Sequence, residues 1–349
     1  MIPSAPVLAV RNLSVDYRLS GRKTLRAVDD VSLQVKDGET LALVGESGCG
    51  KSTIARAVMQ LNPVSGGTIE LEGVDLAGLG RAELKALRHR FQMIFQDPIS
   101  SLNPRRRVRS ILEAPLRIAG MKDADERRRR VERILEFTGM DPAVLDRYPH
   151  EFSGGQCQRL SIARALVLEP KLLVCDEPVS ALDVSVRAQV LNLLNDLQRR
   201  LGLSMLFISH DLAVVRNVAD RVAVMYLGRI CESGPARDVL ERPAHPYTQS
   251  LLSAVPVPDP SHRPGRIALK DSETPSHLSL PGGCRFAPRC PRARTLCHDQ
   301  PPGLTDAGQG RQVACHFPIE DPNAPGVGGG ADGARTDNHK NNRENQLCP

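Results

Sequence analysis

The sequence has 349 residues, of which 41% are hydrophobic and 25% are charged, with a net charge of +6. This length fits one large α/β domain with a smaller addition, and the apolar content is ample for a core. A charge of this size does not indicate nucleic acid by itself. No stretch reaches the roughly 18 apolar residues of a membrane span, and the first residues lack the pattern of a secretory signal. We therefore expect a cytoplasmic protein whose nine cysteines are free thiols or metal ligands.

In chain order, residues 7–44 contain short β-type runs and end in the apolar run TLALVG, which is typical of a buried strand. A glycine-rich turn and a helical segment, KSTIARAVMQL, come next. From about residue 97 to 170 the pattern is helical and charged. The runs KLLVCDEP, AQVLNLLNDLQRRLG, SMLFISHD and RVAVMYLGRICESG then alternate between strand and helix. Such alternation predicts a largely parallel sheet that is covered on both faces.

The composition changes after about residue 255. The stretch PVPDPSHRPG is linker-like, and residues 256–318 are rich in Pro, Cys, Arg and Gly without clear periodicity. The last thirty residues have almost no apolar content, which predicts disorder. We therefore place domains at 7–255, with a helical part at about 97–170, and at 256–320, followed by a disordered tail at 321–349.

The glycine-rich turn fits the phosphate-binding pattern G-x-x-x-x-G-K-[ST]. Its glycines allow backbone N–H groups to surround a phosphate, while the lysine reaches the β- and γ-phosphates and the serine hydroxyl binds Mg²⁺. The pattern follows an expected strand and opens an expected helix, which is the context it requires. Its residues are Gly45, Glu46, Ser47, Gly48, Cys49, Gly50, Lys51 and Ser52.

A phosphate loop needs a further carboxylate for the metal and a group that orients water. The apolar run LLVCDE ends in Asp176, expected to hold Mg²⁺, and Glu177, expected to polarise the attacking water. Two acids after a strand more often cap a helix, and a histidine that ends a strand, as His210 does, is more often a packed residue. Gln96 is equally unremarkable alone. A serine and two glycines before a helix form either an ordinary cap or an anion site; here they stand in the run Ser153, Gly154, Gly155 and Gln156.

Together and in this order, GESGCGKST, Gln96, SGGQ, LLVCDEP, SALD and His210 resemble the nucleotide-binding subunit of ABC transporters over about 250 residues. The resemblance implies a P-loop fold with a RecA-like core, an antiparallel β subdomain and a helical subdomain, followed by a small irregular C-terminal domain. It implies that the SGGQ residues bind the γ-phosphate of ATP held by a partner subunit, in a head-to-tail pair. It also implies that Gln96 joins Ser52 and Asp176 in binding Mg²⁺, that Thr53 lies in the ATP site, that His210 holds the γ-phosphate, and that Tyr17 stacks on adenine.

Four cysteines cluster in the Pro- and Arg-rich segment, at Cys284, Cys290, Cys297 and Cys315. Structural zinc usually uses closely spaced cysteine pairs, which are absent here, so the wider spacing favours a 4Fe–4S cluster. Free cysteines in a loose tail are the alternative. A segment this poor in apolar residues needs some other stabilising element.

The stretch RPAHPYTQSLLSAVP, followed by GCRFAPRCPRARTLC and VACH, resembles the C-terminal extension of oligopeptide and dipeptide importer ATPases. That resemblance implies ATP hydrolysis coupled to peptide import, and it matches the four cysteines to 4Fe–4S ligands. It further implies a second, related ATPase, two membrane permeases and an extracytoplasmic binding protein, with this chain at the cytoplasmic face of the inner membrane. The alternatives are import of another small solute, such as a nickel chelate or a sugar, and a soluble ABC ATPase outside transport.

Two arginine-rich runs, at 105–107 and 127–130, could indicate nucleic acid. The second lies in an amphipathic segment whose Val131, Ile134 and Leu135 should face inward, which leaves the arginines in solvent. No aromatic platform accompanies either run, so we expect no nucleic-acid partner.

Overall fold

The computed structural model describes residues 5–19, 24–255, 278 and 280–319. The expected disorder at 321–349 lies outside the described residues. The described residues form one compact unit. Within the described part of the chain, no helix combines the length and the apolar content that a bilayer crossing requires.

A mixed sheet of eight strands forms the centre of this unit, in the order β11-β12-β10-β9-β3-β8-β7-β6. The five strands from β9 to β6 are parallel, and β10, β12 and β11 continue the sheet antiparallel. The parallel strands are mainly apolar and almost wholly buried, as is typical of strands covered on both faces. The bounds are β3 Thr40–Val44, β6 Phe91–Ile94, β7 Leu172–Asp176, β8 Ser204–Ser209, β9 Arg221–Tyr226, β10 Arg229–Pro235, β11 Thr305–Asp306 and β12 Gln312–Val313.

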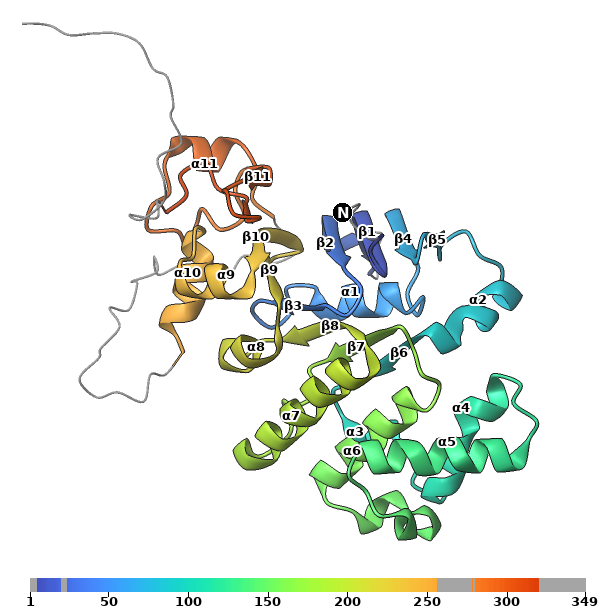
Figure 1. Ribbon diagram of the computed structural model, residues 1–349. Helices are drawn as coiled ribbons and strands as arrows, with labels where there is room; N and C mark the ends of the chain where they lie inside the picture. Colours follow the sequence, from blue (N-terminus) through green and yellow to red (C-terminus); the bar gives the residue numbers. More distant parts are fainter. Residues whose placement is uncertain (1–4, 20–23, 256–277, 279, 320–349) are drawn as a thin grey trace, which may run out of the picture. The chain divides into compact units, whose positions relative to one another are not determined.

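A second, antiparallel sheet of four strands has the order β2-β1-β4-β5. It packs on one face of the central sheet together with α1, and the side chains that fill this layer include Val28, Ile54 and Leu206. Figure 1 shows this blue sheet beside α1. The bounds are β1 Leu8–Arg18, β2 Thr24–Val35, β4 Gly66–Leu71, β5 Val74–Asp75 and α1 Lys51–Val58.

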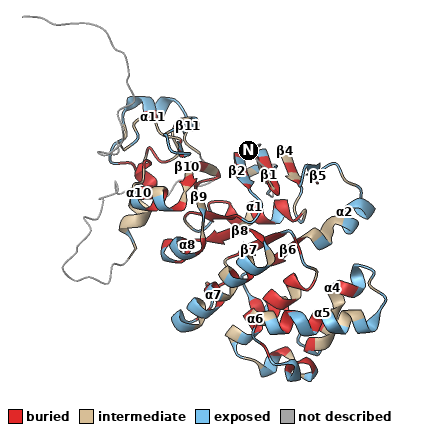
Figure 2. Ribbon diagram, in the orientation of Figure 1, coloured by how far each residue is buried: buried red, intermediate tan, exposed pale blue. Residues whose placement is uncertain are grey.

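Helices cover the other face of the central sheet and form the helical region. Apolar residues of α4, α5, α6 and α7 meet residues of β7 and β8 such as Leu173 and Phe207, and Figure 2 shows exposed residues along α5 and α7, while α6 is largely buried. The bounds are α3 Pro98–Ser101, α4 Val108–Ile118, α5 Ala124–Phe137, η3 Pro142–Asp146, η4 Pro149–Glu151, α6 Gly154–Leu166, α7 Val184–Leu201 and α8 Leu212–Val218. The helix α2 Arg81–Leu87, followed by η2 Arg88–Arg90, packs instead against the layer of the antiparallel sheet.

The inward packing expected for α5 is confirmed, since Val131, Ile134 and Leu135 are its buried residues. Arg129 and Arg130 on the outer face pair with Glu126. Such exposed i,i+3 and i,i+4 pairs each contribute only a few tenths of a kcal/mol. Arg128 and Arg129 are therefore solvated, whereas the Arg127 side chain is only 14% exposed and donates to the carbonyls of Met121 and Lys122.

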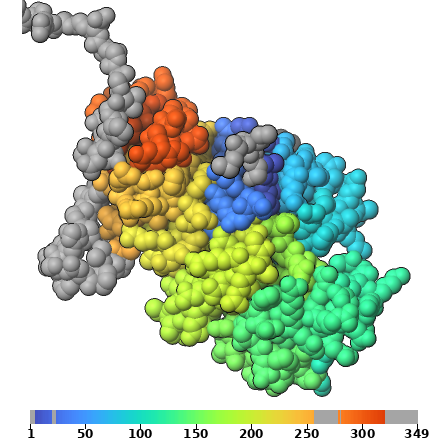
Figure 3. Space-filling view, viewed as in Figure 1, coloured from blue at the N-terminus to red at the C-terminus, as the bar shows by residue number. Residues whose placement is uncertain are grey.

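The C-terminal segment, residues 280–319, packs on the end of the central sheet, as the orange and yellow surfaces of Figure 3 show. Phe286 and Cys290 join Val224 and Tyr247 in one apolar cluster, and β12 pairs with β10. The division at residue 255 stays a prediction, and helices lie on both sides of it. Their bounds are α9 Ala236–Glu241, α10 Pro246–Ser253 and α11 Thr295–Asp299.

Candidate nucleotide site

The topology brings together the motifs that the sequence spaced far apart. β3, β8 and β7 are adjacent parallel strands, so the residues that follow them meet at one edge of the sheet. This edge, at the carboxyl ends of the strands, is where open α/β sheets bind ligands. The phosphate loop follows β3, Asp176 ends β7 and Glu177 follows it, and His210 follows β8.

The phosphate loop depends on glycine at its most confined positions. Gly50 has a φ of 111°, and a Cβ added there would lie 2.5 Å from the carbonyl oxygen of Ala27 and 2.8 Å from Cε of Met225. Only glycine adopts this backbone at such a close approach without strain. Lys51 is 4% exposed, and its Nζ donates to the carbonyl oxygens of Gly45 at 2.8 Å and Glu46 at 2.9 Å.

The two expected metal ligands of the loop and of β7 are in direct contact. The Ser52 hydroxyl lies 2.8 Å from Oδ1 of Asp176 and donates to it. Burial raises the pKa of Asp176, and the hydrogen bond from Ser52 partly offsets that effect. A hydroxyl and a buried carboxylate side by side are hard oxygen ligands of the type that Mg²⁺ prefers.

Glu177 lies next to the other two polar residues of the expected hydrolytic set. Its Oε2 accepts from Nε2 of Gln96 at 3.2 Å, and its Oε1 lies 3.1 Å from Nδ1 of His210. Glu177 has a φ of 48°, a left-handed conformation that costs a non-glycine residue free energy and occurs most often at functional sites. The backbone is held there because the Glu177 N–H donates to the carbonyl of Ile208 at 3.1 Å.

Tyr17, in β1 of the antiparallel sheet, contacts helix α1, which follows the phosphate loop. Its hydroxyl lies 3.3 Å from Oγ1 of Thr53 and accepts a hydrogen bond from Nδ2 of Asn62 at 2.7 Å. The ring is partly buried against the apolar layer under α1. Stacking on adenine stays a prediction, and the contact with Asn62 is one that sequence patterns do not signal.

The SGGQ residues lie apart from this cluster. Ser153 caps α6: its hydroxyl accepts from the N–H of Gln156, whose side chain accepts from the N–H of Ser153. α6 packs on the sheet face that carries Leu173 and Phe207, whereas α1 packs on the opposite face, as Figure 1 also shows. Ser153 and Gln156 at the start of this thirteen-residue helix are exposed, and binding of a phosphate there stays a prediction.

A groove beside Gln96 is lined by apolar side chains from the segments around α2 and β6 and from the helical region. Its volume is about 640 Å³, and three large apolar residues in it are unusually exposed: Leu61 at 51%, Phe95 at 41% and Ile118 at 69%. Exposed apolar residues that gather in one hollow indicate a contact surface. We call this hollow the Phe95 groove; its other lining residues include Met59, Ala86, Pro115 and Leu168.

The prediction of an iron–sulfur cluster is wrong. In the described ranges, no group of three or more His, Cys, Asp or Glu side chains is arranged to hold a metal ion. The cysteines line a cavity of about 20 Å³, which has room for about one water molecule and not for a cluster of iron and sulfide ions. Burial also raises the pKa of Cys284, and that of Cys315 to about 11, which opposes the thiolate form that binds metals. Cys284 and Cys290 instead pack as small apolar residues in the cluster that contains Phe286.

Comparison with known proteins agrees with this arrangement. The sequence pattern of the ABC transporter family matches residues 28–180, and that of the oligopeptide/dipeptide transporter C-terminal region matches residues 231–297. The oligopeptide transport ATP-binding protein OppF of Salmonella typhimurium is 53% identical over 284 residues, which cover 81% of this chain and 85% of that protein. The chain belongs to the ABC transporter ATP-binding proteins. It is accordingly an ATPase of the P-loop class.

Other relatives place this ABC ATPase in the same family. The probable peptide ABC transporter ATP-binding protein y4tS of Sinorhizobium fredii is 51% identical over 292 residues, or 84% of this chain and 82% of that protein. Among solved structures, the ATP-binding cassette MJ0796, a dimer with ADP and phosphate, matches with a TM-score of 0.60 and 27% identity over 66% of this chain and 99% of that one. The protein cbiO1 of Clostridium perfringens, described as part of the ABC transporter complex cbiONQ, matches with a TM-score of 0.61 and 30% identity over 68% of this chain and 91% of that one. The expected ABC cassette fold is therefore confirmed.

Proposed function

We propose that this ABC ATPase drives import of dipeptides or oligopeptides, and that the residues gathered at the carboxyl ends of β3, β7 and β8 hydrolyse the ATP. The observation that carries the proposal is the contact between Ser52 and Asp176, at 2.8 Å, with Glu177 following directly in the chain. Peptide cargo is supported by the C-terminal region at 231–297 and by relatives whose names specify oligopeptide transport.

ATP binding uses the phosphate loop and its surroundings. The loop's backbone N–H groups and Lys51 hold the phosphates, and Tyr17 stacks on the adenine. The oxygen atoms of Ser52, Asp176 and Gln96 hold Mg²⁺, which neutralises charge that develops on the phosphates during transfer. In support, Asp176 ends β7 and Gln96 follows the neighbouring strand β6, while Ser52 contacts Asp176 directly.

Glu177 positions and polarises the attacking water. Its carboxylate is 16% exposed, so it is accessible from the site without being surrounded by bulk solvent. His210 and Gln96 contact its two oxygens, which fixes the orientation of the carboxylate. His210, itself exposed, is then placed to hold the γ-phosphate.

The site is completed by a second subunit. Ser153, Gly154, Gly155 and Gln156 form the start of α6 on the opposite side of the sheet from α1, so they serve the nucleotide of a partner and receive the partner's signature in return. The solved cassette MJ0796 is described as dimeric with ADP and phosphate. We propose that the partner of this chain is a related ATPase, which gives a heterodimer.

The Phe95 groove receives a cytoplasmic loop of a membrane permease. Its exposed Leu61, Phe95 and Ile118 supply an apolar contact surface, and Gln96 follows Phe95 directly in the chain. Docking there transmits movement of the metal and water site to the permease. The chain thus acts at the cytoplasmic face of the membrane, with two permeases and an extracytoplasmic binding protein as further partners.

The test is uptake of labelled peptides by vesicles that contain the complete transporter. The ATPase subunits and ATP are enclosed in the vesicle lumen, which stands for the cytoplasm. Uptake should require ATP and should be lost when Glu177→Gln replaces the native chain, while binding of peptide to the binding protein is kept. A panel with a nickel chelate and a sugar separates the other cargo classes. ATP hydrolysis that no permease or solute alters would contradict a transport function.

A further inference from the structure

The C-terminal segment reaches across the fold to the second residue of the phosphate loop. The guanidinium of Arg289 donates to both carboxylate oxygens of Glu46, at 2.9 Å and 3.0 Å. The Arg289 side chain is only 12% exposed, and that of Glu46 is 32% exposed. This two-point geometry in a partly desolvated place is stronger and more specific than an ordinary surface ion pair.

The backbone of the same residue is held as well. The N–H of Glu46 donates to the hydroxyl oxygen of Tyr247 at 3.0 Å. Tyr247 is itself fixed by an aromatic cluster, because its ring centre lies 4.6 Å from that of Tyr226 and 5.4 Å from that of Phe286. Arg289 lies over the Tyr226 ring, at 5.9 Å from its centre. Both contacts to Glu46 therefore start from one rigid surface.

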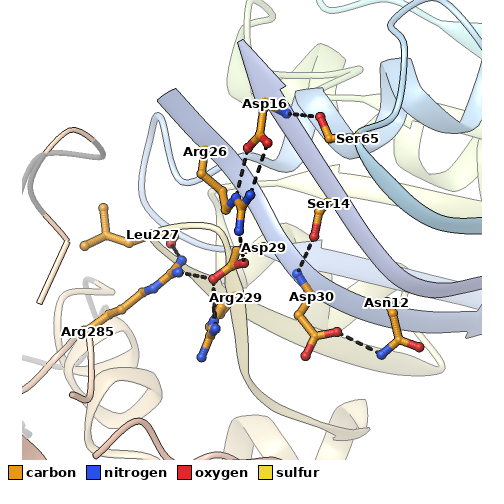
Figure 4. A network of polar contacts seen from close by, with 10 residues as sticks. All are labelled: Asn12, Ser14, Asp16, Arg26, Asp29, Asp30, Ser65, Leu227, Arg229 and Arg285. Carbon is orange, nitrogen blue, oxygen red and sulfur yellow. Dashed lines mark hydrogen bonds and ion pairs between the residues drawn. The ribbon is translucent and has the colours of Figure 1, made fainter. Parts of the chain in front are cut away.

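A second arginine of the C-terminal segment secures the other side of the loop. Arg285 donates to the carbonyl of Leu227 and to Asp29, as Figure 4 shows. The next residue, Gly228, donates its N–H to the carbonyl of Cys49 in the phosphate loop at 2.9 Å, and its own carbonyl accepts from the N–H of Asp29 at 2.9 Å. The C-terminal segment thus holds the turn that supports the loop.

Asp29 is where these contacts converge with the antiparallel sheet. Arg229, Arg285 and Arg26 all reach its carboxylate, and Figure 4 shows Arg26 continuing to Asp16. Burial alone would raise the pKa of Asp29, but the charges of Arg229 and Arg285 outweigh it and hold the pKa below its usual value. The network is therefore charged and structurally fixed at neutral pH.

The positive charge of Arg289 matters for a phosphate ligand. Glu46 places a carboxylate in a loop whose ligand carries several negative charges, and an unpaired carboxylate there would repel it. Lys51, the loop's own cation, contacts the Glu46 backbone carbonyl, whereas the carboxylate is paired by Arg289.

We propose that Arg289 is a positioning residue for nucleotide binding: it holds the start of the phosphate loop through Glu46 and neutralises a carboxylate that otherwise repels the triphosphate. This inference rests on the proposed nucleotide site. It makes the peptide-importer-type C-terminal segment part of the machinery that sets ATP affinity.

The test is the dissociation constant of Mg-ATP, measured by isothermal titration calorimetry on the full-length chain. Arg289→Ala should weaken binding about tenfold, the size expected when one member of a partly buried charge pair is removed. Glu46→Gln alone is measured as the reference for the double variant. The decisive variant is Glu46→Gln combined with Arg289→Ala, which should regain most of the affinity because no carboxylate is left unpaired.

The controls separate this effect from loss of structure. Arg292→Ala, an exposed arginine of the same segment, should leave affinity unchanged. If Arg289→Ala does not fold, Arg289→Lys takes its place; it keeps the charge but loses the two-point geometry and should weaken binding about threefold. Native affinity in the tested Arg289 variant, or a double variant as weak as the single one, would overturn the inference. Failure of the native chain to bind Mg-ATP would instead refute the nucleotide site itself.

Discussion

His245 should make the stability of the fold depend on pH between about 7 and 4. The residue is 2% exposed, its Nδ1 accepts from the N–H of Tyr247 at 3.0 Å, and its ring also hydrogen-bonds to the backbone of Ala314. Burial lowers its pKa from 6.5 to about 4. A proton on Nδ1 would place two donors against each other at the start of α10, so the folded chain excludes that proton.

The sign and size of the effect follow from the two pKa values. The unfolded chain takes up the proton near pH 6.5 and the folded chain only near pH 4, so the contribution is complete above the unfolded pKa and is lost as the pH falls through the folded pKa. Between about pH 7.5 and about pH 5 the loss amounts to about 2 kcal/mol of unfolding free energy.

The assay is urea unfolding at these two pH values for the native chain and for His245→Asn. The amide oxygen of Asn can still accept from Tyr247 but does not titrate, so the variant should lose about 2 kcal/mol less on acidification. Glu232, which accepts from the N–H groups of Ala244 and His245, contributes equally to both chains and cancels. His298→Asn, at an exposed site of the C-terminal segment, should follow the native chain. Equal acid sensitivity of the native chain and His245→Asn would refute the reasoning.

Two further predictions concern packing. Gly50→Ala places a methyl group 2.5 Å from the Ala27 carbonyl oxygen at a φ of 111°. It should reduce Mg-ATP affinity at least about tenfold in calorimetry while the rest of the fold is kept. Gly73→Ala is the control, because a Cβ there would meet open space, and native affinity in Gly50→Ala would contradict the proposed loop. Phe286→Ala removes a ring that is 1% exposed and should lower the unfolding free energy by about 3–5 kcal/mol in urea denaturation, whereas a loss under about 1 kcal/mol would mean that the C-terminal segment does not pack on the sheet.

The contact between the motifs at the nucleotide site could be predicted, because the order of parallel strands determines which loops meet. A phosphate loop after β3 and an acid at the end of β7 must meet if those strands belong to one parallel sheet, and Ser52 and Asp176 do so. The inward face of α5 was equally readable, since its apolar residues recur at helical spacing. Both predictions depend on short-range patterns that a single strand or helix imposes.

The contacts of the C-terminal segment could not be predicted in the same way. Glu46 and Arg289 lie 243 residues apart in sequence, and neither residue type marks the other as its partner. β11 and β12 contain two residues each, too few for a periodic pattern. Cysteine spacing suggested iron–sulfur ligands, but spacing carries no information on burial or on room for a cluster, and the small cavity at Cys290 decides against it.

The central claim is that Glu177 activates the water that attacks ATP, and a single-turnover measurement tests it most directly. The complete transporter is loaded with Mg and γ-labelled ATP, and the nucleotide that remains bound to this chain is identified over time. Glu177→Gln should retain ATP and slow its cleavage by about 100-fold or more, because the amide cannot accept the proton of the water. Cleavage by Glu177→Gln at the native rate would contradict the account.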